Sequence, residues 1–346
     1  MRETHAPTVI LCLPSGDARN AVRAALAAMQ VQWQDILPSK ADLTTLVQTL
    51  RTNTRAVAII DLAGIKHAAV NIVALAALLP DSSTRQRIAL TRGHCGLWPT
   101  DRTWAQELGF ADLYAQLDST SLLAESSGVL DWVAKLTGVV AIQTEVLKQH
   151  FGIAQIKPDH TSQRGMIRRL TNETAEALCV ALAGNVTTQD RTYKLKPYSR
   201  CLLGNEAVDW LAKEYKVTRD DAVRLGNALQ ELGMLHHVAH EQMFADEPFF
   251  YRTEWSAITQ RMSPGASLSL LSSKSGVLVR ERSYLGTNYD ACFVGSHAVD
   301  WLHSKLKLTR LDAEIMLNRL YGFDLIEHVT REHPVQDGMF FYRFVN

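Results

Sequence analysis

Two stretches of the chain, 91 residues apart, are nearly the same: GNEAVDWLAKEYKVTRDDA at residues 204–222 and GSHAVDWLHSKLKLTRLDA at residues 295–313. Extended without a gap, residues 201–252 match residues 292–343 at 22 of 52 columns. A self-match of this length indicates an internal duplication. The shared Val-Asp-Trp-Leu is therefore either a working site or the signature of a fold that is used twice.

Each copy predicts two capped helices followed by a hairpin. Asn205 and Ser296 precede apolar residues at helical spacing and are expected to be N-caps. Thr218 and Thr309 each precede an aspartate by three residues, as in a capping box, and open a second helix. The segments MLHHV and LIEHV, and later FFYR in both copies, are typical of short strands.

The signature itself is interpreted as structural. Asp209 and Asp300 fall near the first helical turn, where the helix dipole favours a carboxylate. Trp210 and Trp301 come one residue before a core-facing leucine, and we expect them to seal the buried face. Contact of the two aspartates with a partner is the alternative.

This order of helices, basic arm and closing Phe-Tyr-Arg strand resembles the DEP domain, over roughly residues 164–346. The resemblance implies two α+β, winged-helix-like domains at residues 164–260 and 261–346. It also implies a role in protein or membrane contacts. The Ser/Gly-rich stretch SPGASLSLLSSKSGV predicts a shortened first helix in the second copy.

Residues 1–138 alternate runs of strand length, at 8–15, 31–37, 55–62, 87–93 and 111–117, with helical patterns that include 66–79 and 121–136. This alternation predicts five βα units and a doubly wound parallel sheet. The pattern resembles the receiver domain of bacterial response regulators, which implies a flavodoxin-like fold. By that resemblance Asp61 is the candidate phospho-acceptor and Thr91 the switch hydroxyl. Residues 139–163 are expected to form a linker.

The receiver pattern is incomplete. Pro14 and Ser15 stand where an acidic pair should hold Mg²⁺, Asp17 is the nearest carboxylate, and Gln116 replaces the lysine. Phosphoryl transfer to a carboxylate depends on such cations. We therefore predict a phosphorylation-independent pseudo-receiver. A phosphorylation-switched regulator with Asp61 as acceptor and the DEP domains as output, and an unrelated α/β domain, remain alternatives.

Composition excludes several classes of protein. Lys plus Arg equals Asp plus Glu at 36 each, so no global field favours nucleic acid. Five scattered cysteines argue against a disulfide framework or a zinc site, and neither a catalytic motif nor a cofactor motif occurs. His236 and His240 fall on a predicted strand, about 13 Å apart, so no metal site is expected. No apolar run reaches the ~18 residues of a membrane span.

A basic arm precedes the first copy, at Arg191, Lys194, Lys196 and Arg200, and is the candidate contact surface for a partner or an anionic membrane. The second arm has only Arg282. The alternative is a solvated hairpin. Taken together, the sequence predicts a non-enzymatic, cytoplasmic, bacterial signalling adaptor that acts through protein contacts and also at the membrane surface.

Overall fold

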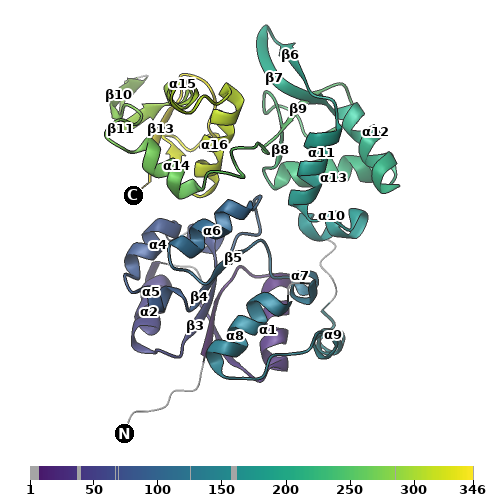
Figure 1. Ribbon diagram of the computed structural model, residues 1–346, viewed down its shortest axis with the longest axis vertical. Coiled ribbons are helices and arrows are strands. Elements are labelled where there is room, and N and C mark those ends of the chain that lie inside the picture. The colour runs from purple at the N-terminus through teal and green to yellow at the C-terminus, as the bar shows by residue number, and fades with distance from the viewer. Residues whose placement is uncertain are drawn as a thin grey trace. The chain divides into compact units, whose positions relative to one another are not determined.

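The computed structural model describes residues 8–36, 40–66, 68, 70–124, 126–156, 162–284 and 286–345 (Figure 1). The chain forms two compact units. The first consists of Met1–Leu97 and Ala105–Thr253, and the second of Trp98–Trp104 and Glu254–Asn346.

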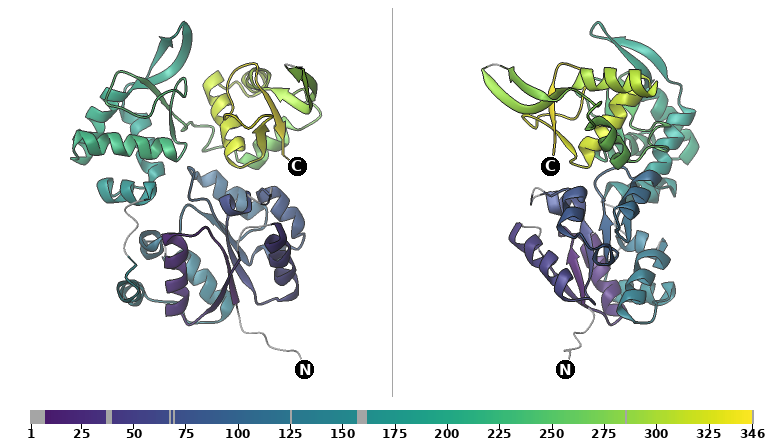
Figure 2. Two further views of the ribbon diagram at one scale, coloured as in Figure 1. Left: turned by 180° about the vertical axis from the view of Figure 1, so that it is seen from behind. Right: turned by 60° about the vertical axis from the view of Figure 1, so that its left-hand side comes forward.

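The N-terminal domain is built on a five-stranded sheet whose strands are all parallel, in the order β2-β1-β3-β4-β5. Its strands are β1 (Thr8–Cys12), β2 (Gln32–Asp35), β3 (Val57–Asp61), β4 (Ile88–Thr91) and β5 (Asp112–Tyr114). Each strand lies within one of the five predicted segments. Every residue of β3 is buried, as expected for a strand covered by helices on both faces (Figure 2).

The helices of this domain depart from the expectation at one place, the start of the fourth helix. They are α1 (Asp17–Ala28), α2 (Lys40–Thr52), α3 (Leu62–Lys66), α4 (Ile72–Leu78), α5 (Ser82–Arg85), α6 (Pro99–Glu107), α7 (Ser119–Ala124) and α8 (Ser126–Thr137). The helix expected at 66–79 begins only at Ile72, because the Asn71 side chain accepts a hydrogen bond from the N–H of Ala74 at 2.9 Å and caps it. The helix expected at 121–136 is covered by α7 and α8, and residue 125 between them lies outside the described residues.

The expected linker at 139–163 contains a helix, α9 (Thr144–Ile153). Its Leu147 and Phe151, four residues apart on one helix face, are buried in the same hydrophobic cluster as α1. This part of the segment therefore belongs to the core of the N-terminal domain and is not a free linker. Residues 157–161 of the segment lie outside the described residues.

The two repeat copies have matching four-stranded sheets, β6-β7-β9-β8 and β10-β11-β13-β12, and matching elements from α11 and α14 onward. The first copy contains α10 (Gln163–Thr171), α11 (Ala175–Asn185), β6 (Gln189–Tyr193), β7 (Lys196–Leu203), α12 (Gly204–Tyr215), α13 (Arg219–Glu231), β8 (Leu235–His237) and β9 (Phe250–Thr253). The second contains α14 (Pro264–Leu271), β10 (Arg280–Tyr284), β11 (Thr287–Val294), α15 (Gly295–Leu306), α16 (Arg310–Gly322), β12 (Ile326–His328) and β13 (Phe341–Phe344). The opening helix α14 is short, as predicted.

The predicted N-caps at Asn205 and Ser296 are wrong, because both helices begin one residue earlier, at Gly204 and Gly295. Backbone carbonyls of the loop before the last strand accept the first N–H groups instead: Gly204 donates to Phe249 and Gly295 to Phe340, at 3.0 and 2.9 Å. A side-chain cap is therefore not needed. The capping boxes of α13 and α16 are confirmed, since both threonine side chains accept from the predicted aspartate N–H at 3.1 Å.

An asparagine at the same column fixes the loop before the last strand in each copy. Asn227 donates to the carbonyl of Phe244 and accepts from its N–H, at 3.0 and 3.1 Å. Asn318 makes the same two bonds to Val335, at 3.1 and 2.8 Å. The loop backbone is thus held to the second helix of each copy by one side chain.

The residues that pack beneath this loop differ between the copies. In the first copy Gly226 lies against Phe244, and a Cβ at Gly226 would come within 2.0 Å of the phenyl ring. In the second copy the equivalent positions hold Leu317 and Val335, which are both fully buried. One copy fills this part of its core with a large loop residue, the other with a large helix residue.

A buried ion pair lies inside the second compact unit. Arg319 donates to Asp101 at 2.5 Å and to the carbonyl of Met262 at 2.7 Å, and the two charged side chains are 8% and 0% exposed. The equivalent residue of the first copy is Ala228. The repeat fold itself therefore does not require this pair.

No helix among the described residues is both long and apolar enough to span a bilayer.

Candidate functional site

Asp61 and Thr91 end adjacent parallel strands and meet at the carboxyl edge of the N-terminal sheet. The two residues are paired in register between β3 and β4, and the Thr91 hydroxyl donates to the Asp61 carboxylate at 2.7 Å. Both side chains are buried. The sequence therefore identified two residues that the fold brings together.

The Asp61 carboxylate accepts several hydrogen bonds within the fold. Its other oxygen accepts hydrogen bonds from the backbone N–H groups of Ala63 and Gly64, at 3.0 and 3.3 Å. Burial raises the pKa of Asp61, while the hydrogen bonds from Thr91 and these N–H groups act in the opposite direction. The carboxylate thus joins the ends of β3 and β4 to the start of α3.

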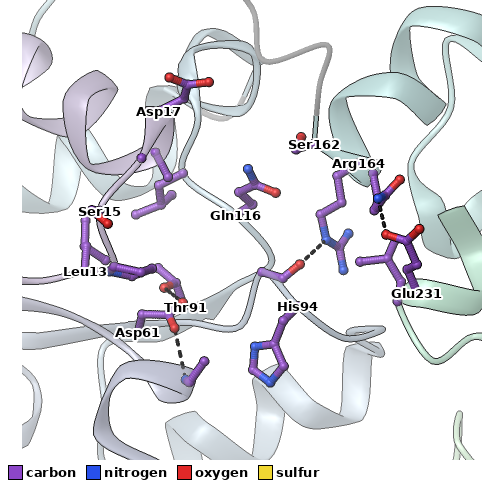
Figure 3. Close-up of a pocket in the computed structure, with 18 residues that line it drawn as sticks. Leu13, Ser15, Asp17, Asp61, Thr91, His94, Gln116, Ser162, Arg164 and Glu231 are labelled. Atoms are coloured by element: carbon purple, nitrogen blue, oxygen red, sulfur yellow. Dashed lines mark hydrogen bonds between the residues drawn. The ribbon is translucent and has the colours of Figure 1, made fainter. Parts of the chain in front are cut away.

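A cavity of about 470 Å³ lies over this pair (Figure 3). Its lining includes Pro14, Ser15 and Gln116, the three residues at which the chain departs from the receiver pattern, together with Asp17. Asp61 also lines it. The fold therefore gathers these sequence positions around one cavity, where neither an acidic pair nor a lysine is present among the described lining residues.

The first repeat copy closes one side of the same cavity through Arg164 of α10 and Glu231 of α13 (Figure 3). Arg164 donates to the carbonyl of Gly93 at 3.0 Å and pairs with Glu176 of α11 at 2.8 Å. Glu176 in turn accepts from the N–H of Leu97 at 2.9 Å. This pair therefore holds the loop that follows β4, which begins at Arg92, against the first copy.

The Arg164–Glu176 pair is nearly buried, with side-chain exposures of 10% and 17%. Burial by itself would raise the pKa of Glu176, but the positive charge of Arg164 and its hydrogen bonds lower it. The sequence analysis did not find these two residues. They lie upstream of the gap-free repeat match, and no motif marks either of them.

His94, in the loop held by Arg164, is kept neutral. Burial, together with the charges of Arg92, Lys66 and Arg164, lowers the pKa of His94 to about 4. The folded protein therefore does not take up a proton at His94 until the pH is far below the usual histidine range.

We expect this histidine to make the protein less stable in mild acid. The unfolded chain takes up a proton at His94 below about pH 6.5, whereas the folded chain does so only near pH 4, so stability falls as the pH drops through this window. Because the His94 side chain is exposed to solvent, the loss at pH 5 is well below the ~1.4 kcal/mol per pKa unit that a fully buried group would give. Denaturant unfolding of wild type and His94→Gln at pH 7 and pH 5 measures it. An equal pH dependence of both proteins contradicts the expectation.

The basic arm forms the β6–β7 hairpin, and part of its charge is used inside the first copy. Lys194 pairs with Glu241 at 2.7 Å, and the Arg191 guanidinium lies 5.4 Å from the centre of the Phe250 ring. The tip residue Leu195 is 97% exposed. The arm thus presents an apolar tip beside cations that are held by neighbouring side chains.

The aspartates of the repeated signature take part in the same network in each copy. Arg219, the first residue of α13, donates to Asp209 at 2.5 Å and to Asp246 at 2.7 Å. In the second copy Arg310 donates to Asp300 and to Asp337 at the same distances. Both arginines and both signature aspartates are well exposed, so each pair contributes little to stability.

These aspartates lie in the second helical turn, so the predicted interaction with the helix N-terminus is wrong. The identical arginine and the identical downstream aspartate in each copy were visible in the sequence. Their pairing was not, because it joins residues 27 positions apart.

Trp210 and Trp301 are half-buried and not core residues, which corrects the expectation. The Trp210 ring packs edge-on against Tyr215, and the Trp301 indole N–H donates to the carbonyl of Ser275 at 3.0 Å. Successive helical residues point about 100° apart, so the residue before a buried leucine lies at the margin of the apolar face. Fully buried aromatic residues of the two copies include Tyr251 and Tyr342, in the closing strands, and Phe244 and Phe293.

The expected strand through His236 and His240 is also wrong. β8 ends at His237, the chain turns, and the two imidazole rings stack with centroids 4.9 Å apart. In the described part of the chain no group of three or more His, Cys, Asp or Glu side chains is arranged to hold a metal ion.

Comparison with known proteins identifies the repeated fold. The model of the domain found in Dishevelled, Egl-10 and Pleckstrin (DEP) matches residues 185–253 and 276–344. The two matches keep the offset of 91 residues that the repeat showed. The chain therefore contains two DEP domains in tandem, preceded by an α/β domain.

Among curated proteins, the chain is similar to the phosphatidylinositol 3,4,5-trisphosphate-dependent Rac exchanger 1 protein of mouse, at 30% identity over 167 residues. That match covers 45% of this chain and 10% of the mouse protein. The vacuolar membrane-associated protein IML1 of Debaryomyces hansenii is 35% identical over 77 residues, 22% of this chain and 5% of the yeast protein. The chain thus spans a tenth or less of these relatives. They are eukaryotic, and they lend no support to the expected bacterial source.

Proposed function

We propose that this protein is a non-enzymatic signalling regulator in the cytoplasm, in which the tandem DEP domains contact a partner and the α/β domain controls the first of them. The two DEP domains carry the proposal, because the relatives that share this region are named as an exchanger dependent on a phosphoinositide and as a membrane-associated protein. The Arg164–Glu176 pair supports the control step, since it joins the loop after β4 to the first DEP domain.

The α/β domain is proposed to be a pseudo-receiver. Its strand order, 2-1-3-4-5, is the order of flavodoxin-like folds, which supports the receiver-like assignment. Both oxygens of Asp61 already accept hydrogen bonds, and Gln116 stands in the position expected for a lysine. The domain would then act through its contact with the first DEP domain and not through an acyl phosphate.

The first test concerns the contact surface. The exposed tip and the cations of the β6–β7 hairpin favour an anionic membrane surface, to which each basic group contributes on the order of 1 kcal/mol. We expect the full chain to sediment with vesicles containing phosphatidylserine, more weakly at high salt, and not with vesicles of phosphatidylcholine alone. The double variant Lys194→Glu/Lys196→Glu should lose this binding.

The matched control is Lys305→Glu/Lys307→Glu, which reverses two exposed lysines of the second DEP domain. It should bind vesicles like the wild type. Unchanged sedimentation of the hairpin variant would show that the hairpin is not part of the surface that contacts the membrane. Retention of a protein partner by wild type but not by the hairpin variant, without vesicle binding, would assign the surface to protein contact.

The second test concerns phosphorylation. Incubation with acetyl phosphate and Mg²⁺ should leave the mass of the intact protein unchanged. Gln116 replaces the lysine, and Pro14 and Ser15 replace the acidic pair that would hold Mg²⁺, so the cations that stabilise an acyl phosphate are missing. Intact-mass spectrometry reads this out directly, with an authentic receiver domain as positive control. Stoichiometric, Mg²⁺-dependent gain of one phosphoryl group that disappears in Asp61→Asn would establish the phosphorylation-switched alternative instead.

A further inference from the structure

The cavity above Asp61 has the size and the place of a small-molecule site. Its volume of about 470 Å³ lies within the range of roughly 300–1,000 Å³ that ligand pockets occupy. It lies at the carboxyl ends of β1 and β3, where the strand order changes direction and where open parallel sheets bind ligands. The proposed regulatory function does not assign a ligand to this cavity.

The charges around the cavity disfavour an anion. Asp17 and Glu231 contribute carboxylates to the lining, and the guanidinium of Arg164 is already paired with Glu176. Asp17 also occupies the first turn of α1, where the helix dipole would otherwise attract a phosphate. His94 is neutral at physiological pH and adds no positive charge.

The carboxylates of Asp17 and Glu231 only accept hydrogen bonds, so the lining favours a molecule that donates them, and the other polar groups can adapt to it. Ser15 and Gln116 bring a hydroxyl and an amide from two different loops, and Gln116 points toward the open space (Figure 3). Leu13, Pro14 and Leu117 provide apolar contact between them. A few polar groups set in an apolar wall are the usual composition of a small-molecule pocket.

We propose that this cavity binds a small organic molecule that carries N–H donors and no anionic group, such as a nucleobase, a nucleoside or an amine. The consequence for signalling rests on the proposed function. Because α10 and α13 of the first DEP domain supply part of the lining, a bound molecule would hold that domain against the α/β domain.

The test uses the purified full-length chain with neither vesicles nor partner, so its result is independent of the vesicle experiment. Ligand-observed NMR is run with a panel of aminopyrimidines, nucleosides and aliphatic amines, each with its phosphorylated or carboxylated counterpart. We expect members of the uncharged and cationic set to bind, and the anionic counterparts to bind at least tenfold more weakly.

Two substitutions place the binding in the cavity. Ser15→Trp, at an exposed loop position, should fill the cavity and abolish binding, while Gln116→Leu should weaken binding at least tenfold. The control is Gln48→Trp, on the exposed face of α2 and outside the cavity lining, which should leave binding unchanged. Unchanged melting temperatures show that the variants are folded. Absence of binding by the whole panel, equal or tighter binding of the anionic members, or binding that survives both Ser15→Trp and Gln116→Leu would overturn the proposal.

Discussion

Replacing Gly226 by leucine is expected to destabilise the first DEP domain by about 3 kcal/mol. Even a Cβ at this position would come within 2.0 Å of the Phe244 ring, and Phe244 is almost completely buried, so neither group has room to move. Insertion of methylenes into a packed core costs about 1–3 kcal/mol, and occasionally more. Denaturant unfolding of the full chain, followed by tryptophan fluorescence, measures the change.

The second DEP domain supplies the compensating substitution. It holds Leu317 and Val335 at the equivalent positions, so the double variant Gly226→Leu/Phe244→Val should recover most of the lost stability. The single variant Phe244→Val should itself be destabilised, because it leaves a cavity beside Gly226. The coupling energy between the two sites should then be about 2 kcal/mol or more, since substitutions of contacting residues are not additive. Additive losses would show that the two copies do not pack this region in the same way.

Replacing Glu176 by alanine is expected to lower the free energy of unfolding by about 3 kcal/mol. The change removes the partner of a nearly buried guanidinium and leaves the N–H of Leu97 without its acceptor. Removal of one member of a buried pair costs about 3–5 kcal/mol, and partial exposure here places the value at the lower end. Glu173→Ala is the matched control, because Glu173 lies three residues away and is exposed; it should change stability little.

Acid should reduce the difference in the free energy of unfolding between wild type and Glu176→Ala. Since the pKa of Glu176 is lower in the folded protein than in the unfolded chain, its contribution is complete above about pH 4.5 and is lost as the pH falls through the folded value. Unfolding measured at pH 7 and at pH 4 tests this. A loss that is the same at both pH values, or as large in Glu173→Ala, would mean that the Arg164–Glu176 charge pair is not what holds the loop after β4.

Regular elements with a strong local pattern could be predicted from the sequence. The strands β1, β3 and β4 are short apolar runs whose residues are almost all buried, and the threonine caps at Thr218 and Thr309 depend on residues three positions apart. Both kinds of signal are local. Asp61 and Thr91 were named from the resemblance to receiver domains, and they meet because the ends of adjacent parallel strands lie at one edge of a sheet.

Predictions failed where a distant segment supplied the partner. Asn205 and Ser296 were expected to cap helices, but loop carbonyls more than 40 residues downstream in the chain accept the first helical N–H groups. The tryptophans were placed in the core from helical spacing alone, although a residue one position from the buried leucine lies at the margin of the face. Their surroundings are set by the neighbouring segments, which spacing does not reveal.

The sequence by itself determined that one fold is used twice, and that Pro14, Ser15 and Gln116 stand where the receiver pattern has an acidic pair and a lysine, because identities at a fixed offset and residue types are properties of the chain alone. Only the tertiary structure decided that Arg164 and Glu176 hold the loop after β4, and that Gly226 and Phe244 in one copy replace Leu317 and Val335 in the other. The physical reason is that charge pairing and close packing depend on distances between residues far apart in sequence, which are fixed only when the chain is folded.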